Sequence, residues 1–230
     1  MAAVTRVLGL PRLHLRVTAS TNERARALAV GGAPHGTLVT AAEQTAGRGR
    51  QGRSWVGPPG RALLLSLVLR DPTPLAPLAA GVAVAEIASG AIKWPNDVLV
   101  GGRKVAGILV EGRPQEGWAV LGIGLNVAVT PADLPAELRE RAGGLGLAPA
   151  DLEPTLDRLL GALESWLAHD AATVLDAVRA RDALEGRAVR WAGGAGRAVG
   201  IDDAGRLLVG TSSGTIALDA GEVHLADPAS

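Results

Sequence analysis

The sequence predicts an α/β domain, built as a mixed sheet flanked by helices, followed by a small β barrel. Apolar β runs alternate with helical segments through most of the chain, a pattern typical of a sheet covered by helices. From Gly186 onward, about five short β runs are separated by Gly and Asp, which indicates a small barrel. The predicted domains therefore span residues 1–183 and 184–230.

Length and composition narrow the classes of protein that the chain can belong to. With 230 residues, 47% of them hydrophobic, it can bury a substantial core. The absence of Cys excludes disulfides, thiolate nucleophiles and Cys-ligated zinc. Lys plus Arg equals Asp plus Glu at 23 each, and this zero net charge argues against nucleic-acid binding through overall charge. Without a run suited to a signal sequence or a membrane span, the protein is expected to be cytoplasmic.

The first elements follow from local patterns. A short strand is expected at residues 13–18, and STNE at residues 20–23 predicts a helix start, because hydroxyl and amide side chains cap helices. Gly31 and Gly32 should end that helix. Residues 37–41 are β-branched enough for a strand, and the apolar run at residues 62–69 predicts a strand buried on both faces.

The later elements are predicted in the same way. Residues 75–89 indicate a mostly buried helix, and two β runs joined across Gly101, Gly102 and Arg103 predict a hairpin. Another strand is expected at residues 118–129. The helix-rich segment at residues 131–183 carries apolar side chains at helical spacing, which indicates packing: Leu156, Leu159, Leu160, Leu163 and Leu167.

The stretch AEQTAGRGRQGRSW, residues 42–55, has glycines in the G-x-G-x-x-G spacing of dinucleotide-binding loops. That motif needs a helix starting within the glycines, and Pro58-Pro59-Gly60 cannot begin one. A P-loop is excluded because the Gly-Lys-Ser/Thr ending is missing. Two interpretations stay open: an extended anion-binding loop using Arg48, Arg50 and Arg53, or a mobile basic surface loop.

Several polar and aromatic residues outside the glycines could carry chemistry. Trp55 offers a flat surface for a base, unless it is ordinary core. KWPND, residues 93–97, supplies an amide that can read adenine and a carboxylate that can hold Mg²⁺ or act as a base, or it is only a capped turn. Lys104 could lie over a carboxylate or phosphate, or be a solvated turn residue. Asn126, on an apolar strand, needs partners or a ligand.

Taken together, five motifs resemble those of biotin protein ligases in order and in spelling. They are STN (residues 20–22), Q-x-x-GRGRQGRSW (44–55), KWPNDVL (93–99), K-x-AGILVE (104–111) and GIGLNV (122–127). The resemblance covers nearly the whole chain. It implies a catalytic domain similar to class II synthetase and lipoate ligase-like folds, followed by an SH3-like barrel. The segment at residues 87–92 is short for the family.

The resemblance also implies an activity. Such enzymes activate biotin with MgATP to biotinyl-5′-AMP, then transfer biotin to one lysine of a biotin carboxyl carrier protein domain. ATP, Mg²⁺ and biotin are thus expected, with no permanently bound cofactor. With STN starting at Ser20, no room is expected for an N-terminal helix-turn-helix, so neither DNA nor a membrane is an expected partner, and a homodimer is left open.

By the same resemblance, the motif residues receive expected roles. The expected biotin site comprises Ser20, Thr21, Asn22, Gln44, Gly47, Arg48, Arg50, Trp94, Lys104 and Gly107. The expected nucleotide site comprises Arg48, Arg50, Arg53, Trp55, Lys93, Asn96, Lys104 and Asn126. Lys104, Arg50 and Asp97 are the expected catalytic residues, and Asp97 is also the expected magnesium ligand.

Two other functions remain as alternatives. A lipoate or octanoate ligase or transferase would share the catalytic fold and also acylates carrier lysines, although the spellings GRGRQGRSW and KWPND favour biotin. A non-enzymatic RNA-binding module would use RGRQGR with Trp55, but zero net charge and the carboxylate of KWPND argue against it.

Overall fold

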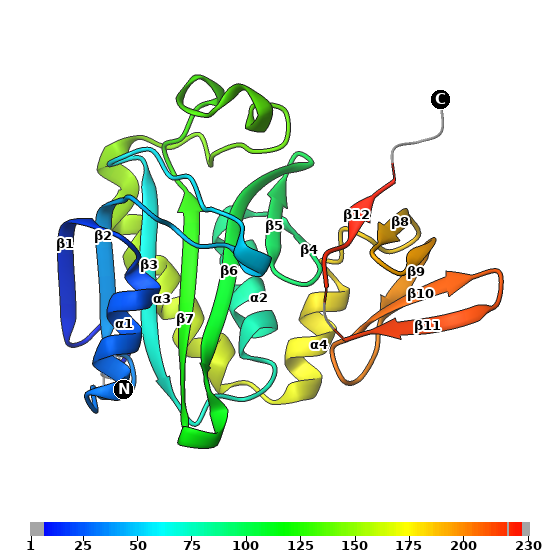
Figure 1. The fold of residues 1–230 in the computed structure, drawn as a ribbon, viewed down its shortest axis with the longest axis horizontal. Helices are drawn as coiled ribbons and strands as arrows, with labels where there is room; N and C mark the ends of the chain where they lie inside the picture. Colours follow the sequence, from blue (N-terminus) through cyan, green and yellow to red (C-terminus); the bar gives the residue numbers. More distant parts are fainter. Residues whose placement is uncertain (1–6, 220, 227–230) are drawn as a thin grey trace, which may run out of the picture.

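The computed structural model describes residues 7–219 and 221–226, in which a large mixed sheet is joined to a smaller antiparallel sheet (Figure 1). Residues 1–6, which begin the segment where no signal sequence is expected, lie outside the described residues. The large sheet has the order β1-β2-β3-β7-β6-β5-β4. Its strands are β1 (Arg12–Thr18), β2 (Leu38–Gln44), β3 (Ala62–Arg70), β4 (Ala91–Lys93), β5 (Asp97–Val100), β6 (Arg103–Arg113) and β7 (Trp118–Asn126). Only β1 and β2 pair in parallel, so the mixed sheet is confirmed.

The apolar run that predicts a strand buried on both faces forms β3, the centre of this sheet. All but the last residue of β3 are buried, because helices cover both faces of the sheet. On one face, α1 (Thr21–Val30) packs against β2, β3 and β7. On the other, α2 (Ala76–Ala88) packs against β5 and β6, and α3 (Leu152–Ala168) packs on α2 (Figure 1). The predicted flanking helices are confirmed.

Turn chemistry explains two of the boundaries. Gly101 and Gly102, at φ 56° and 78°, make the tight turn between β5 and β6, as the hairpin prediction requires. The helix start at Ser20 is also confirmed, but the expected side-chain cap is wrong. The Ser20 hydroxyl makes no capping hydrogen bond, and the Thr21 N–H donates to the side chain of Gln44 instead.

The five C-terminal β runs form a second sheet in the order β11-β10-β9-β8-β12. Its strands are β8 (Ala188–Trp191), β9 (Gly194–Ile201), β10 (Leu207–Thr211), β11 (Gly214–Leu218) and β12 (His224–Leu225). The predicted C-terminal β domain is confirmed, although its strands do not close into a complete barrel within the described residues. Strand β12 has only two residues and pairs with β8 alone, so β11 and β12 remain the two edges of an open sheet.

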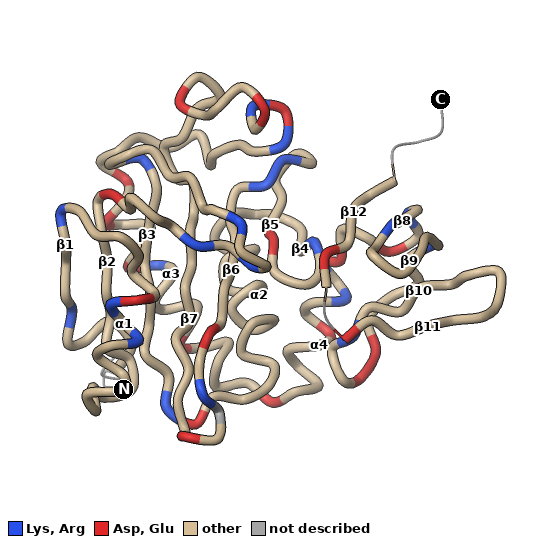
Figure 2. The backbone as a smooth tube through the Cα atoms, in the orientation of Figure 1, with Lys and Arg blue, Asp and Glu red and all other residues tan. Residues whose placement is uncertain are grey.

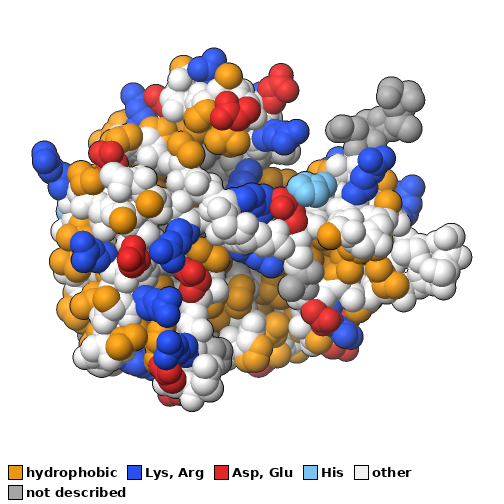
Figure 3. All heavy atoms as spheres, in the orientation of Figure 1, with side chains coloured by type: hydrophobic (Ala, Val, Ile, Leu, Met, Phe, Trp, Pro, Cys, Tyr) orange, Lys and Arg blue, Asp and Glu red, His pale blue; other side chains and the backbone are white. Residues whose placement is uncertain are grey.

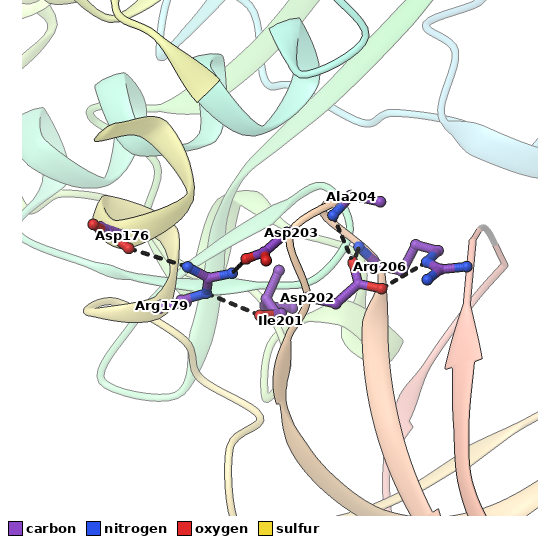
Figure 4. A network of polar contacts seen from close by, with 7 residues as sticks. All are labelled: Asp176, Arg179, Ile201, Asp202, Asp203, Ala204 and Arg206. Atoms are coloured by element: carbon purple, nitrogen blue, oxygen red, sulfur yellow. Dashed lines mark hydrogen bonds and ion pairs between the residues drawn. The ribbon is translucent and has the colours of Figure 1, made fainter. Parts of the chain in front are cut away.

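Polar contacts fasten the second sheet to the first domain (Figure 4). Arg179, the last residue of α4 (Ala171–Arg179), donates to the carbonyl of Ile201 at 2.9 Å and pairs with Asp176 and Asp203. In the turn between β9 and β10, Asp202 accepts hydrogen bonds from the backbone of Ala204 and Arg206, and also pairs with the Arg206 side chain. The contacts of Arg179 thereby hold the second sheet against α4.

Candidate active site

A cleft of about 780 Å³ opens where β6 and β7 meet the Gly/Arg segment. The start of α1, residues 134–142 and the segment from Glu222 to Leu225 complete its walls. The predicted site residues that line it are Ser20, Thr21, Asn22, Gln44, Arg48, Arg50, Arg53, Trp55, Lys93, Asn96, Asp97, Lys104, Gly107 and Asn126. Motifs far apart in the sequence thus share one cleft.

Two predicted residues do not line this cleft. Trp94 is 3% exposed, and its indole N–H donates to the carbonyl of Gly205 at 3.0 Å, so it faces the second sheet. Gly47 lies at the base of the Gly/Arg segment beside a neighbouring groove. A Cβ on Gly47 would lie 2.5 Å from the Trp55 carbonyl, so the close backbone approach there requires glycine.

The backbone of the Gly/Arg segment is paired as a short hairpin, so it is not extended over its whole length. The carbonyl of Gly47 accepts a hydrogen bond from Trp55 N–H, Gly49 N–H donates to Arg53, and Arg48 pairs with Ser54. We call residues 47–55 the finger. A 3₁₀ turn, Arg50–Gly52, closes its tip, with Gln51 in the left-handed region at φ 55°. The finger therefore presents its arginines from a paired backbone (Figure 2).

One end of the cleft is lined by neutral polar side chains. Thr21 donates to Gln44 Oε1 from its backbone N–H at 2.6 Å and from its hydroxyl at 2.9 Å. Asn22 Nδ2 donates to Glu111 Oε2 at 2.8 Å. Ser66 Oγ lies 2.6 Å from Asn22 Oδ1. The sequence predicts no role for Glu111, although it ends the motif K-x-AGILVE, or for Ser66, which is a hydroxyl residue within an apolar run.

Glycines form the floor of the middle of the cleft. Gly107 on β6 and Gly124 on β7 are direct partners across the sheet, and the indole of Trp55 lies against both. A Cβ on Gly124 would lie 2.3 Å from Trp55 Cε2, and a Cβ on Gly107 would lie 3.0 Å from Trp55 Cζ3. The indole needs a surface without side chains. Gly122, further along β7, makes similar room for Asn22.

Charged residues gather at the other end of the cleft, between the finger and the second sheet (Figure 2), and Figure 3 shows their side chains there. Lys104 Nζ lies 2.6 Å from Asp97 Oδ1 and 5.6 Å from the centre of the Trp55 ring. Arg50 donates to Asn96 Oδ1 at 3.3 Å. Burial lowers the pKa of Lys93 and of Arg50, while the Asp97 charge opposes this shift in both. An anionic ligand here would compensate for this desolvation.

The second sheet supplies carboxylate and imidazole groups to this end. Arg53 of the finger pairs with Glu222, and His224 Nε2 lies 3.6 Å from the same carboxylate. Both Glu222 and His224 line the cleft, as does Leu225. The sequence assigned these residues no role, because their approach to the finger depends on contacts across more than a hundred residues.

Apart from Asp97 Oδ1, which is paired with the Lys104 ammonium, two buried polar atoms of the cleft residues have no partner among the described residues. Asn126 donates from Nδ2 to the Gly143 carbonyl at 2.8 Å, which leaves its Oδ1 as an unpaired acceptor. Trp55 Nε1 is an unpaired donor. Buried polar groups are normally hydrogen-bonded, so each is suited to meet a group of a bound ligand.

The described residues include no group of three or more Asp, Glu or His side chains that could hold a metal ion by themselves. Asp97 is nonetheless compatible with Mg²⁺ that arrives with a nucleotide, because such ions use one or two carboxylates together with phosphates and water.

In the part of the chain that the structure describes, no helix has the length and apolar character of a membrane span.

Comparisons with known proteins agree with this architecture. Residues 14–127 match the "Biotin/lipoate A/B protein ligase family", and residues 178–225 match the "Biotin protein ligase C terminal domain". The biotin–[acetyl-CoA-carboxylase] ligase of Mycobacterium tuberculosis is 37% identical, over 90% of this chain and 86% of that protein. The corresponding ligase of Paracoccus denitrificans is 36% identical, over 90% of this chain and 97% of that protein.

A solved structure supports the same relationship. The biotin protein ligase of Aquifex aeolicus, in complex with biotin and ATP, superposes with a TM-score of 0.81 at 27% identity, covering 94% of this chain and 99% of that one. The bifunctional ligase/repressor BirA of Bacillus subtilis is 35% identical, over 96% of this chain and 76% of that protein. The matching motifs, both domains and the overall fold lead to one conclusion: the chain belongs to the biotin protein ligase family.

Proposed function

We propose that this protein activates biotin with ATP to biotinyl-5′-AMP and then transfers biotin to a lysine of a biotin carboxyl carrier protein domain. The observation that carries the proposal is a single cleft with neutral hydrogen-bonding groups at one end, a glycine floor, and cations at the other. Its polarity matches biotin, which has a neutral ureido ring at one end and a carboxylate at the other.

The biotin end is supported by the polar residues around the start of α1. Ser20, Thr21, Asn22 and Gln44 would bind the ureido group, because a neutral ureido group requires both donors and acceptors on rigid elements. The glycine floor lies between these residues and the cationic end. The aliphatic chain of biotin would run along this middle part of the cleft, with its carboxylate directed to Lys104 and Arg50.

The nucleotide is proposed to occupy the rest of the cleft. Trp55 would pack on the adenine ring, and the unpaired Oδ1 of Asn126 would accept from the adenine amino group. The phosphates would lie among the cations. These are Arg48, Arg50, Arg53, Lys93 and Lys104, with Asn96 held beside them by its hydrogen bond to the Ile108 carbonyl.

The chemistry has two steps. In the first, a biotin carboxylate oxygen bonds to the α-phosphorus of ATP while the bond to the bridging oxygen breaks and pyrophosphate leaves. Lys104 and Arg50 would neutralise the two approaching anions. In the second, the acceptor lysine nitrogen bonds to the acyl carbon and AMP leaves. Asp97, paired with Lys104, would bind Mg²⁺ with ATP or accept the lysine proton.

The acceptor protein and the cellular location are part of the same proposal. The relatives from Mycobacterium tuberculosis and Paracoccus denitrificans are named for acetyl-CoA carboxylase, so its biotin carrier domain is the proposed acceptor. A cytoplasmic location, the domain boundary near residues 183–186 and the absence of a DNA partner remain predictions from the sequence.

Calorimetry with the two rival acids tests the substrate. Biotin and lipoate are titrated separately into the purified protein, with and without MgATP. We expect tight binding of biotin and none of lipoate, because lipoate has no ureido group for Thr21, Asn22 and Gln44. Binding of lipoate alone would retain the fold and the mechanism but overturn the proposed substrate.

A further inference from the structure

A connected set of hydrogen bonds runs behind the neutral end of the cleft. It links Glu111, Asn22, Ser66, Thr21 and Gln44, with the donor and acceptor atoms of each link 2.6 to 2.9 Å apart. Ser66 is fully buried, and Thr21 and Asn22 are 4% and 6% exposed. Two of these residues, Ser66 and Glu111, have no assigned role in binding or catalysis.

Glu111 fixes the orientation of the Asn22 amide. An ionised carboxylate can only accept hydrogen bonds, so the atom of Asn22 that lies 2.8 Å from it must be the NH₂ group. The Asn22 carbonyl oxygen then faces Ser66 Oγ at 2.6 Å, and this oxygen can only accept. The single hydroxyl hydrogen of Ser66 therefore has a preferred acceptor, although Thr21 Oγ1 is also within 2.8 Å.

A backbone group fixes the other amide. The Thr21 N–H can only donate, so the atom of Gln44 that lies 2.6 Å from it must be the carbonyl oxygen. The Gln44 NH₂ group is thereby turned away from Thr21. It lies on the side of Gly47, where a Cβ would come within 3.0 Å of Nε2.

Packing leaves little freedom for the amides to turn. A Cβ on Gly122 would lie only 2.1 Å from Asn22 Oδ1, so the amide sits directly against the backbone of β7. Ser66 holds it from the neighbouring strand β3. With the carbonyl oxygens of both amides committed inward, the groups that these two amides leave for a ligand are N–H donors.

Resting on the proposed function, we propose that Glu111 and Ser66 are positioning residues that set the donor and acceptor directions of the ureido pocket. They hold Asn22 so that, together with Gln44, this end of the cleft offers N–H groups to a carbonyl oxygen. The pocket then selects a cyclic urea through its oxygen, in preference to an analogue of the same shape with a weaker acceptor.

The test compares biotin with 2′-thiobiotin, a neutral analogue in which sulfur replaces the ureido oxygen. Both are titrated calorimetrically into wild type and into Glu111→Leu, Ser66→Ala and Glu111→Gln. Thr155→Val is the control, because Thr155 is a buried polar residue on α3 outside this set. The measured quantity is the ratio of the two dissociation constants.

We expect the preference for biotin to fall about tenfold in Glu111→Leu and in Ser66→Ala, since one orienting hydrogen bond is worth roughly a factor of ten. Glu111→Gln retains an acceptor for Asn22 and should keep the ratio within about twofold of wild type, as should Thr155→Val. ATP affinity should be unchanged in all variants.

Equal losses for both ligands, with the ratio unchanged, would show a purely structural role and overturn the inference. The same holds if Glu111→Gln behaves like Glu111→Leu, because the acceptor would then not be the cause. A wild-type protein that binds neither ligand would instead overturn the proposed function, so the two failures are distinguishable.

Discussion

At the scale of single residues, the site depends on side chains that are absent as much as on those present. Gly107, Gly122 and Gly124 hold a strip of β6 and β7 bare, and Trp55 and Asn22 occupy part of it. Trp55 and Asn22 can therefore lie directly against the strand backbones while they line the cleft. Larger residues at these positions would push these side chains into the space that the proposed substrates require.

Replacing Gly124 with Ala tests this strip. The added Cβ would lie 2.3 Å from Trp55 Cε2, so the indole must move from the floor of the cleft. We expect ATP affinity in the presence of biotin to fall about tenfold, in line with the value of stacking one base on an aromatic ring. Gly161→Ala is the control, because nothing lies within 4 Å of that helical position. Unchanged ATP affinity in Gly124→Ala would show that Trp55 does not hold the nucleotide.

Lys104 is the residue for which the strongest catalytic effect is expected. Lys104→Met removes the ammonium that lies 2.6 Å from Asp97, and with it one donor to the developing negative charge. Biotinyl-5′-AMP formation at saturating substrates should slow by about 100-fold. The neighbouring exposed Arg103→Met, whose side chain does not line the cleft, should stay near the wild-type rate. Equal rates in both variants would remove Lys104 from the catalytic step.

The sequence predicts the site residues that lie in recognisable motifs. It does not predict those whose role depends on contacts with residues distant in the sequence. The roles expected for Lys104, Asp97 and Asn126 follow from the resemblance of their motifs to those of biotin protein ligases. Ser66 was overlooked because a hydroxyl in an apolar run resembles ordinary core. Its contact with Asn22 joins residues 44 positions apart, and no local pattern encodes such a distance.

At the scale of elements, the finger is the part with the most consequential geometry. The sequence predicts the arginines of the finger but not its backbone pairing. Gln51 closes the hairpin in the left-handed conformation, which only Gly adopts freely, so its sequence does not indicate such a turn. The turn at Gly101 and Gly102 was predicted correctly for the opposite reason, since glycine at both central positions is its sequence signature. Elements with a local code were thus predictable.

The pair between Arg53 and Glu222 is expected to restrain the finger before ligands bind. Both side chains are partly exposed, so the pair should contribute only about 0.2–1 kcal/mol. Glu222→Gln should therefore speed trypsin cleavage within the finger by about two- to fivefold, and biotin with MgATP should protect it again. Glu116→Gln breaks a comparable pair on a distant hairpin and serves as the control. If Glu222→Gln left the rate of cleavage unchanged, the pair between Arg53 and Glu222 would not be what restrains the finger.

At the scale of the whole molecule, the second sheet completes the site. The indole of Trp94 bonds to the turn at Gly205, and Glu222 and His224 reach the cleft from the far side. The sequence predicted a C-terminal β domain, but it did not predict an open sheet or its approach to the finger. Both depend on contacts between distant segments, such as that of Arg179 with Asp203.

Asp182 lies between α4 and the second sheet, and its buried carboxyl is expected to make the stability of the protein depend on pH. Burial raises its pKa, and its Oδ2 has no hydrogen-bond partner among the described residues. A carboxyl with a raised pKa binds more protons when folded, so its contribution to stability falls as pH rises from its ordinary pKa of about 4 through the raised value.

Asp182→Asn removes the free-energy cost of burying an ionised carboxylate and keeps an acceptor for the Leu184 N–H. We expect the melting temperature to rise by about 2 °C at pH 7, and the gain to vanish below about pH 4. Glu137→Gln makes the same charge change at an exposed position and should show no such pH dependence. A gain that persists at low pH would have another cause than the carboxyl charge.

The most direct test of the account is mass spectrometry of the small molecules formed when the purified protein is incubated with biotin and MgATP. The account predicts biotinyl-5′-AMP and pyrophosphate with the wild-type protein, no adenylate when biotin is replaced by lipoate, and much slower formation with Lys104→Met. Absence of biotinyl-5′-AMP from a folded, biotin-bound protein would contradict the claim that this cleft joins the biotin carboxylate to the α-phosphate of ATP.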